Sequence, residues 1–161
     1  MAKTPEQRLA EVSPAEKSKG IFKLFLGYAP GVGKSYNMLS EAIRRHSRGE
    51  DVVIGIVETH GRKGVSELAC QLEAVPRRKI DYKGTIFEEM DTDAIVARNP
   101  QVVLVDELAH TNIPGSKHRK RYEDVLEIIE AKIDVLSTLN IQHIESIAPK
   151  MCIRDRGSVW M

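Results

Sequence analysis

The sequence predicts an α/β domain of three layers, in which a mainly parallel β-sheet is covered by helices on both faces. Apolar segments of strand length alternate with amphipathic segments of helix length along most of the chain. A glycine-rich stretch, residues 27–35, joins the first apolar segment to the first helical one. A later apolar segment ends in the acidic pair Asp106-Glu107. This alternation favours parallel strands joined by crossover helices.

Local patterns define each element in turn. Strands are expected at the apolar runs 22–27, 52–57, 80–82, 101–105 and 133–139. Helices are expected at 35–48, 65–72, 92–98, 122–132 and from 142 to 147. Gly49 supplies a C-terminal stop for the first helix, and Asp91 an N-terminal cap for the third. Asn99-Pro100 ends that third helix, because proline disfavours a helical residue before it.

Composition sets the broad class. The chain has 161 residues, enough for one domain with a real core, and a formal net charge of +1. This balance excludes a globally basic nucleic-acid binder. No apolar run approaches the roughly 20 residues of a membrane span, and the polar leader 1–20 has no signal-peptide core. The two cysteines have no metal-ligand spacing. We expect a cytoplasmic domain without direct membrane insertion.

The glycine-rich stretch predicts a phosphate-binding P-loop, and with it a P-loop NTPase-like domain. Glycines let backbone N–H groups surround phosphate oxygens, and the following helix directs its positive dipole end at the anion. Tyr28 stands where the strict pattern has its first glycine, so the alternative is a plain surface turn before a helix. The residues expected to bind a nucleotide here are Gly31, Val32, Gly33, Lys34, Ser35 and Tyr36.

Asp106 and Glu107 follow a run typical of a buried parallel strand. Ligands gather at the carboxyl edge of such sheets. Asp106 is therefore predicted to hold Mg²⁺ together with the Ser35 hydroxyl, and Glu107 to polarise an attacking water or hydroxyl. Lys34 and Glu107 are the candidate catalytic residues. A strand that merely ends at a polar turn is the alternative for Asp106.

The segment 58–63 leaves the second strand at the same edge. It is read as a switch-like loop, in which Thr59 meets Mg²⁺ or a water and Arg62 meets a phosphate oxygen. A solvated loop turning at Gly61 is the alternative. His110 is predicted to shuttle a proton or bond the γ-phosphate, or else to pair with a backbone carbonyl.

Several further polar residues have more than one possible role. Thr138 and Asn140 end the last strand, where one of them would orient a water unless both only complete strand-end hydrogen bonds. His143 is expected to pack within its helix rather than bind metal. The basic run 117–121 would contact an acidic partner or phosphates, or form a solvated face, which we favour.

The tail, residues 150–161, has neither helical nor strand periodicity. We expect it to be non-native sequence after a truncated domain. The proposed domain, residues 21–149, would then be incomplete at its C-terminal end.

Four segments in order carry a family resemblance: Gly27–Ser35, Val57–Lys63, Asp106–Asn112 and Asn140–Ser146. They closely resemble the N-terminal domain of the KdpD family, the osmosensitive, potassium-responsive sensor histidine kinases of bacteria. The resemblance covers residues 22–147, and the family also tolerates a residue other than glycine at the position of Tyr28.

The resemblance implies a cytoplasmic P-loop domain that binds ATP and regulates a distant histidine-kinase core. A universal-stress-protein-like domain, membrane helices, a sensor region and the kinase core would follow in a complete member. The chain, a fragment without that core, is not expected to phosphorylate histidine by itself.

Three functions from different classes remain open at this point. The first is a regulatory module that binds ATP and Mg²⁺ with slow or no turnover. The second is an active ATPase or a phosphotransferase acting on a protein hydroxyl, with Glu107 as base and Lys34 and Arg62 as charge stabilisers. The third is an interaction domain with an empty loop. The intact set Lys34, Ser35, Asp106 and Glu107 favours the first two.

Overall fold

The computed structural model describes residues 17–29, 33–151 and 158–160. Its strands are β1 (Phe22–Gly27), β2 (Val52–Ile56), β3 (Glu73–Ala74), β4 (Arg78–Tyr82), β5 (Thr85–Glu89), β6 (Val102–Val105), β7 (Asp134–Asn140) and β8 (Ser158–Trp160). Its helices are α2 (Lys34–Ser47), α3 (Lys63–Ala69), α4 (Thr92–Arg98), α5 (Arg121–Glu130), α6 (Ile144–Ile147) and the short 3-10 helix η1 (Ile141–His143). The expected alternation of strands and helices is confirmed except between α3 and α4, where β3, which was not predicted, β4 and β5 follow one another.

Six strands form one sheet in the order β3-β2-β6-β7-β1-β8, and every neighbouring pair is parallel. Strand β7 lies between β1 and β6. The strand that precedes the glycine-rich loop and the strand that ends at Asp106 are therefore one strand apart. The residues at the end of β7 consequently lie between these two predicted halves of the site.

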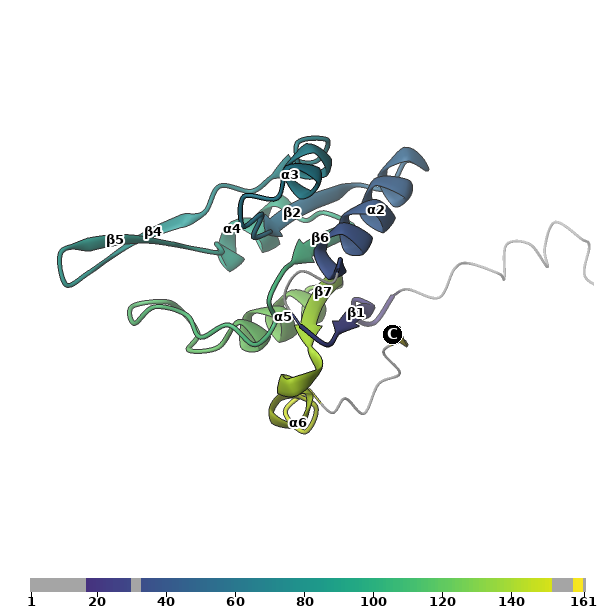
Figure 1. The fold of residues 1–161 in the computed structure, drawn as a ribbon. Coiled ribbons are helices and arrows are strands. Elements are labelled where there is room, and N and C mark those ends of the chain that lie inside the picture. The colour runs from purple at the N-terminus through teal and green to yellow at the C-terminus, as the bar shows by residue number, and fades with distance from the viewer. Residues whose placement is uncertain (1–16, 30–32, 152–157, 161) are drawn as a thin grey trace, which may run out of the picture.

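Helices cover both faces of the sheet (Figure 1). Alternate strand residues point to opposite faces, so β6 sends Val102 and Leu104 to one face and Val103 and Val105 to the other. The first pair packs with α2 and α3, and the second packs with α4 and α5. Two apolar clusters, one on each side, hold the three layers together.

The predicted boundaries hold to within a few residues, and the predicted stop and cap are present. Gly49 has a φ of +93°, which a glycine adopts without strain. The Asp91 side chain accepts a hydrogen bond of 3.0 Å from the Ala94 N–H at the start of α4.

The segment 78–89 differs from the prediction of one short strand. It forms an antiparallel hairpin, β4–β5, which projects away from the main sheet (Figure 1). Lys83 and Gly84 join the two strands with φ values of +53° and +78°, as a two-residue hairpin turn requires. Most hairpin residues are exposed, so no alternation of buried apolar residues marked the second strand.

The two ends of the chain were expected to be a loose, partly helical polar leader and a tail without regular structure. Residues 1–16 of the predicted leader lie outside the described residues, whereas Gly20 already packs on the domain and donates a 2.8 Å hydrogen bond to the Ile129 carbonyl. In the tail, β8 pairs with β1, which differs from the expectation of no strand there. Within the described residues, no helix has the length and apolar character needed to cross a membrane.

Candidate functional site

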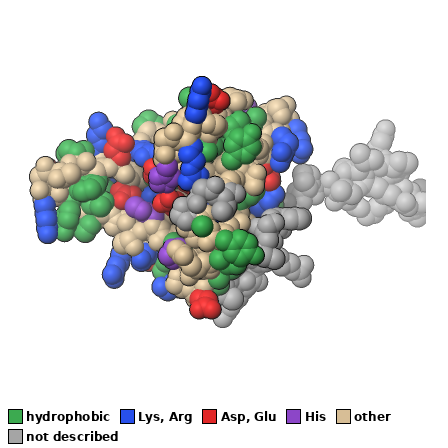
Figure 2. Space-filling view, viewed as in Figure 1, with side chains coloured by type: hydrophobic (Ala, Val, Ile, Leu, Met, Phe, Trp, Pro, Cys, Tyr) green, Lys and Arg blue, Asp and Glu red, His purple; other side chains and the backbone are tan. Residues whose placement is uncertain are grey.

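A cavity of about 240 Å³ opens at the carboxyl edge of the sheet. Every segment that lines it comes from the end of β1, β2, β6 or β7 or from the loop or helix that follows, which is the usual ligand position in such sheets. The lining residues are Lys34, Ser35, His60, Arg62, Asp106, Glu107, Leu108, Ala109, His110, Thr138, Leu139, Asn140 and His143. Histidine, acidic and basic side chains gather near the centre of this face (Figure 2).

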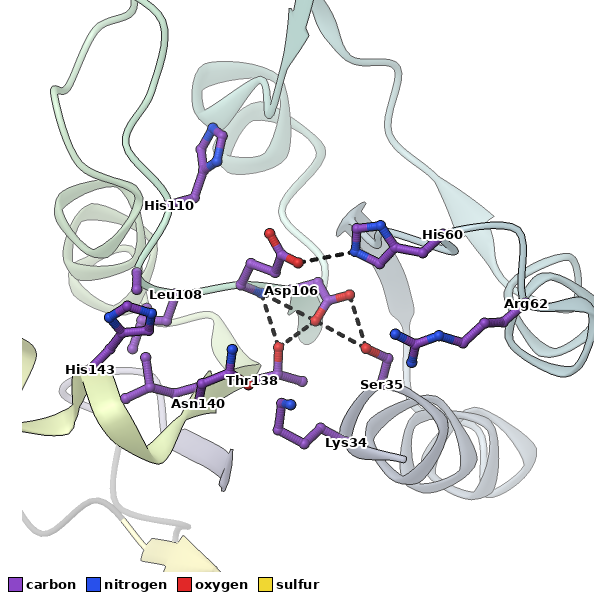
Figure 3. A pocket seen from close by; sticks show the side chains of 13 residues that line it. Lys34, Ser35, His60, Arg62, Asp106, Leu108, His110, Thr138, Asn140 and His143 are labelled. Atoms are coloured by element: carbon purple, nitrogen blue, oxygen red, sulfur yellow. Dashed lines mark hydrogen bonds and ion pairs between the residues drawn. The ribbon is translucent and has the colours of Figure 1, made fainter. Parts of the chain in front are cut away.

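Asp106 is the centre of the hydrogen bonding in the cavity (Figure 3). Only 1% of it is exposed, and its carboxylate accepts hydrogen bonds from four uncharged donors. These donors are the Ser35 hydroxyl at 3.1 Å, the Thr138 hydroxyl, and the backbone N–H groups of Glu58 and Glu107, each at 3.1 Å. Among the described residues, no Lys, Arg or His nitrogen lies within 4.0 Å of this carboxylate, so its negative charge has no direct protein counterion.

The order of the strands explains why Thr138 takes part. Thr138 is aligned with Phe25 of β1, and the adjacent Ser137 with Val105 of β6, so the end of β7 lies beside Asp106. The Thr138 hydroxyl donates to Asp106 and accepts a 2.9 Å hydrogen bond from the Glu107 N–H. Strand-end hydrogen bonding, one of the two readings of Thr138, is what the structure contains.

Lys34 and Arg62 make the other side of the cavity positive. Partial burial lowers the pKa of the Lys34 ammonium, Asp106 and Glu107 oppose this, and Arg62 lowers it further. A nearby cation disfavours the charged form of a lysine and a nearby carboxylate favours it, so Arg62 and Asp106 act on Lys34 in opposite directions. In Figure 3 the Arg62 guanidinium and the Lys34 ammonium both point toward the cavity.

The start of α2 suits an anion as well. Gly33 has a φ of +91°, a conformation that side-chain-bearing residues rarely adopt, and no acidic residue occupies the first turn of this 14-residue helix. The free N–H groups and the dipole of the helix therefore face the cavity without an internal anion. A phosphate group fits this donor set.

A magnesium ion fits only as a companion of such a phosphate. Mg²⁺ takes oxygen ligands, commonly one or two carboxylates with waters and phosphate oxygens. The Asp106 carboxylate and the Ser35 hydroxyl are oxygen groups of this kind. In the described part of the chain, no cluster of three or more His, Cys, Asp or Glu side chains is placed to hold a metal ion alone.

Glu107 and His110 line the cavity but have protein partners. The Glu107 carboxylate lies 3.1 Å from His60 Nε2. His110 Nε2 lies 3.0 Å from the buried carboxylate of Glu89, so this ring nitrogen is turned to Glu89 rather than to Asp106. The contact with Glu89 is not the backbone carbonyl pairing that was the alternative for His110, and its roles in proton transfer or in bonding the γ-phosphate stay predictions.

Five other predicted binding residues do not line the cavity or cannot be placed, and Gly33, just before α2, is one of those outside the lining. Gly31 and Val32 lie outside the described residues. Tyr36 is 49% exposed and is not part of the lining. Thr59 also lies outside the lining, and its backbone carbonyl accepts a 2.9 Å hydrogen bond from the Arg62 N–H. Thr59 thus helps to form the turn that presents His60 and Arg62.

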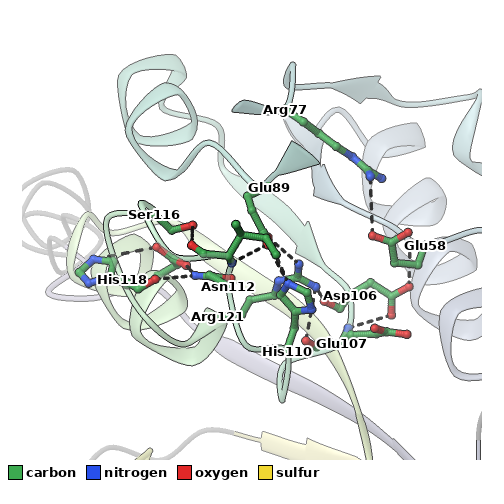
Figure 4. A network of polar contacts seen from close by, with 12 residues as sticks. Glu58, Arg77, Glu89, Asp106, Glu107, His110, Asn112, Ser116, His118 and Arg121 are labelled. Carbon is green, nitrogen blue, oxygen red and sulfur yellow. Dashed lines mark hydrogen bonds and ion pairs between the residues drawn. The ribbon is translucent and has the colours of Figure 1, made fainter. Parts of the chain in front are cut away.

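The basic run 117–121 does not form the expected solvated face. Lys117 pairs with Asp93 and Glu127, and His118 pairs with Glu127. Arg121 is 1% exposed and donates a 2.9 Å hydrogen bond to the Asp106 carbonyl (Figure 4). Lys120 donates to the Thr111 hydroxyl, so the side chains of four of the five residues have partners within the domain.

Three lining residues received no firm binding role from the sequence. His60 lies at the cavity, where the loop after β2 contacts the loop after β6. Asn140 has a buried Oδ1 without a partner among the described residues, so this atom is available to a ligand or water. His143, expected to pack within its helix, lines the cavity from η1. Their positions depend on how β2, β6 and β7 align, which no local pattern encodes.

Comparison with known proteins identifies the family. Residues 18–153 match the family described as KdpD, osmosensitive K+ channel His kinase sensor domain. The sensor protein KdpD of Mycobacterium tuberculosis (strain ATCC 25618 / H37Rv) is 55% identical over 129 residues, 80% of this chain and 15% of the relative. That of Escherichia coli (strain K12) is 44% identical over 143 residues, 89% of this chain and 16% of the relative. A putative sensor protein KdpD of Synechocystis sp. is 56% identical over 129 residues, 80% of this chain and 35% of the relative.

The chain thus spans between 15% and 35% of the length of these relatives. The match extends a few residues beyond both ends of the segment that resembled the family in sequence. The chain belongs to the KdpD family of osmosensitive K+ channel histidine-kinase sensor domains.

Proposed function

We propose that this domain binds ATP with Mg²⁺ and serves as a regulatory module of a potassium- and osmotic-stress-responsive sensor histidine kinase. Its P-loop, residues 31–35, and its α/β architecture would be those of a P-loop NTPase-like domain. We place it on the cytoplasmic side, next to the universal-stress-like domain and kinase core of the complete protein, which would be its partners.

One observation carries the proposal. A carboxylate without a counterion, Asp106, lies 3.1 Å from the Ser35 hydroxyl, while Lys34 and Arg62 put positive charge on the other side of the same cavity. A magnesium ion would satisfy the carboxylate and the phosphates would satisfy the cations. A metal–polyphosphate complex supplies both charges in one ligand.

Regulation requires ATP to favour one arrangement of the loops 58–63 and 107–116 over another. Each loop brings side chains to the cavity, His60 and Arg62 from the first and His110 from the second. Bound nucleotide would therefore contact both loops, and their order would be transmitted to neighbouring domains.

The runner-up is an ATPase or a phosphotransferase acting on a protein hydroxyl. The half-exposed Glu107 carboxylate at the cavity favours it, because a general base needs access to water or to an acceptor hydroxyl. Lys34 and Arg62 would then stabilise charge during transfer.

Calorimetric titration of ATP-Mg²⁺ tests the proposal on the purified chain and two variants. We expect Lys34→Ala to weaken binding by roughly 10–100-fold, because it removes a charge-assisted contact to phosphate. Lys79→Ala removes an exposed lysine of β4, outside the cavity lining, and should bind like the parent chain. A folded parent chain that binds no ATP would favour the interaction-domain alternative, and fast turnover abolished by Glu107→Gln would favour the runner-up.

A further inference from the structure

His60 and Glu107 meet at the cavity across two loops. His60 follows β2 and Glu107 follows β6, and His60 Nε2 lies 3.1 Å from Glu107 Oε1 (Figure 3). Their side chains are 53% and 49% exposed, so the contact borders the cavity rather than the core. Neither side chain is a buried charge that requires a partner. We therefore look for a role of this contact in the function of the cavity.

Both partners have an unusual backbone conformation. His60 has a φ of +48° and Glu107 a φ of +52°. A residue with a side chain pays about 1–3 kcal/mol for such a conformation, and residues of this kind cluster at functional sites. Two of them facing each other across one cavity suggest that the local geometry is selected for the contact.

The same hydrogen bonds that hold Asp106 also hold Glu107. The Glu107 N–H donates to Asp106 Oδ1 at 3.1 Å and to the Thr138 hydroxyl at 2.9 Å. The position of its carboxylate is thus set by the predicted magnesium ligand and by β7. On the other loop, the turn closed by Thr59 and Arg62 fixes the backbone that carries His60.

A carboxylate bonded to His60 is poorly placed to act as a base. General-base catalysis requires a free oxygen within hydrogen-bond reach of the water that attacks. Glu107 Oε1 instead accepts from the imidazole, which also fixes the direction of the carboxylate. This oxygen is therefore engaged, and the contact fixes how the second oxygen, Oε2, is turned.

We propose that His60 is a positioning residue that withholds Glu107 from catalysis, so that bound ATP is retained. This inference rests on the proposed ATP site and explains how a complete set of catalytic groups can give slow turnover. When the hydrogen bond between His60 and Glu107 breaks, the water oxygen bonds to the γ-phosphorus and its proton passes to Glu107. The bond from the γ-phosphorus to the β–γ bridging oxygen breaks, and ADP leaves with that electron pair.

The test measures binding and chemistry separately. ATP-Mg²⁺ affinity is measured by calorimetry, and a single turnover is followed by release of labelled phosphate from γ-labelled ATP. His60→Ala should hydrolyse ATP at least about tenfold faster than the parent chain, because a freed general base contributes factors of this size or larger. Its affinity should stay within about threefold of the parent value.

Two further variants link the effect to the contact. His60→Gln retains a hydrogen-bond donor and should return the rate toward that of the parent chain. The double variant His60→Ala with Glu107→Gln should lose the gain, since no base is left. His46→Ala removes an exposed histidine of α2 remote from the cavity and serves as the matched control.

The outcomes separate the inference from the proposed function. Intact ATP binding by His60→Ala with an unchanged or slower turnover overturns the role of His60 alone. No ATP binding by the folded parent chain overturns both proposals. If the alanine variant is unstable in a thermal melt, His60→Leu, which keeps bulk without a donor, gives the same test.

Discussion

Two buried aspartates at opposite edges of the same sheet have different surroundings. Asp106 directly follows β6 at the carboxyl edge, and Asp134 begins β7 at the amino edge. They are 1% and 6% exposed. Asp134 is paired with Lys17 and with Arg45, whose nitrogen lies 3.0 Å away, and it accepts a 2.7 Å hydrogen bond from the Ile21 N–H. Asp106 accepts only from uncharged donors.

The difference separates a charge paired within the domain from one that we propose is paired by a ligand. Burying an ion is unfavourable unless it is paired, and at Asp134 the domain supplies its own counterions. At Asp106 it supplies dipoles that hold the carboxylate in place, and among the described residues no Lys, Arg or His nitrogen lies within 4.0 Å of it. The amino edge is therefore closed by the chain itself, while the carboxyl edge leaves the carboxylate without a direct ion pair, as the proposed magnesium site requires.

The largest effect on stability is expected at the buried ion pair of Arg121 and Glu89, which lies behind the cavity (Figure 4). Like Asp134, Glu89 has a cation of the domain itself as its partner. The Arg121 guanidinium lies 3.5 Å from Glu89 and 2.9 Å from the Asp106 carbonyl, and both side chains are buried. We expect Arg121→Met to lower the free energy of unfolding by about 3–5 kcal/mol, because it leaves a buried carboxylate short of its cation. Chemical denaturation measures this loss.

The neighbouring arginine is the control for that substitution. Arg119 is exposed in the same basic run, so Arg119→Met should change stability by less than about 0.5 kcal/mol. Adding Glu89→Gln to Arg121→Met should restore part of the stability, since the unpaired charge is then gone. Equal small losses for both arginines would show that the buried pair does not stabilise the domain.

Asp134 should show a smaller loss with a distinctive pH dependence. Burial by itself raises the pKa of Asp134, but hydrogen bonds from Lys17, the Ile21 N–H and Arg45 outweigh it and hold the pKa below 3.8. We expect Asp134→Asn to lower the free energy of unfolding by about 1–2 kcal/mol at neutral pH, with Lys17 contributing little because it is partly exposed.

The sign of the pH effect follows from the depressed pKa. The folded state binds the proton of Asp134 more weakly than the unfolded state does, so its contribution is complete above pH 3.8 and is lost as the pH falls toward the folded-state pKa. Denaturation of both proteins between pH 7 and pH 3 should show the difference between them shrinking only below about pH 4. A difference that is constant to pH 3 would contradict the assignment of the shift to Asp134.

The sequence predicted the layers of the domain better than the contacts between loops. Apolar runs such as 102–105 must be buried on both sheet faces wherever they occur, so their pattern alone indicates strands. Asp106 could be predicted because it directly follows such a run. The hairpin β4–β5 could not be predicted fully, because its exposed strands carry no buried apolar repeat.

Residues brought together across the sheet were harder to predict. His60 and Glu107 are 47 positions apart, and Arg121 and Glu89 are 32 apart. Arg121 was read as part of a solvated charged face because its neighbours are charged. Its burial depends on Glu89, which the unpredicted second strand of the hairpin delivers. The role of Thr138 likewise required knowing that β7 lies between β1 and β6.

Asp106 should give the smallest effect on stability of the three, together with a large effect on binding. In Asp106→Asn, an amide nitrogen replaces a carboxylate oxygen that accepts from the Glu58 or the Glu107 N–H, but the substitution also removes a buried charge that forms no ion pair with the described residues. These changes oppose each other, so we expect the free energy of unfolding without Mg²⁺ to change by less than about 1 kcal/mol. ATP affinity in the presence of Mg²⁺ should fall at least about tenfold, and removal of Mg²⁺ from the parent chain should reproduce most of that loss. The contradicting result is a loss of stability as large as that of Asp134→Asn with unchanged affinity for ATP-Mg²⁺. Both aspartates would then be structural, and the difference between the two edges of the sheet would play no part in ligand binding.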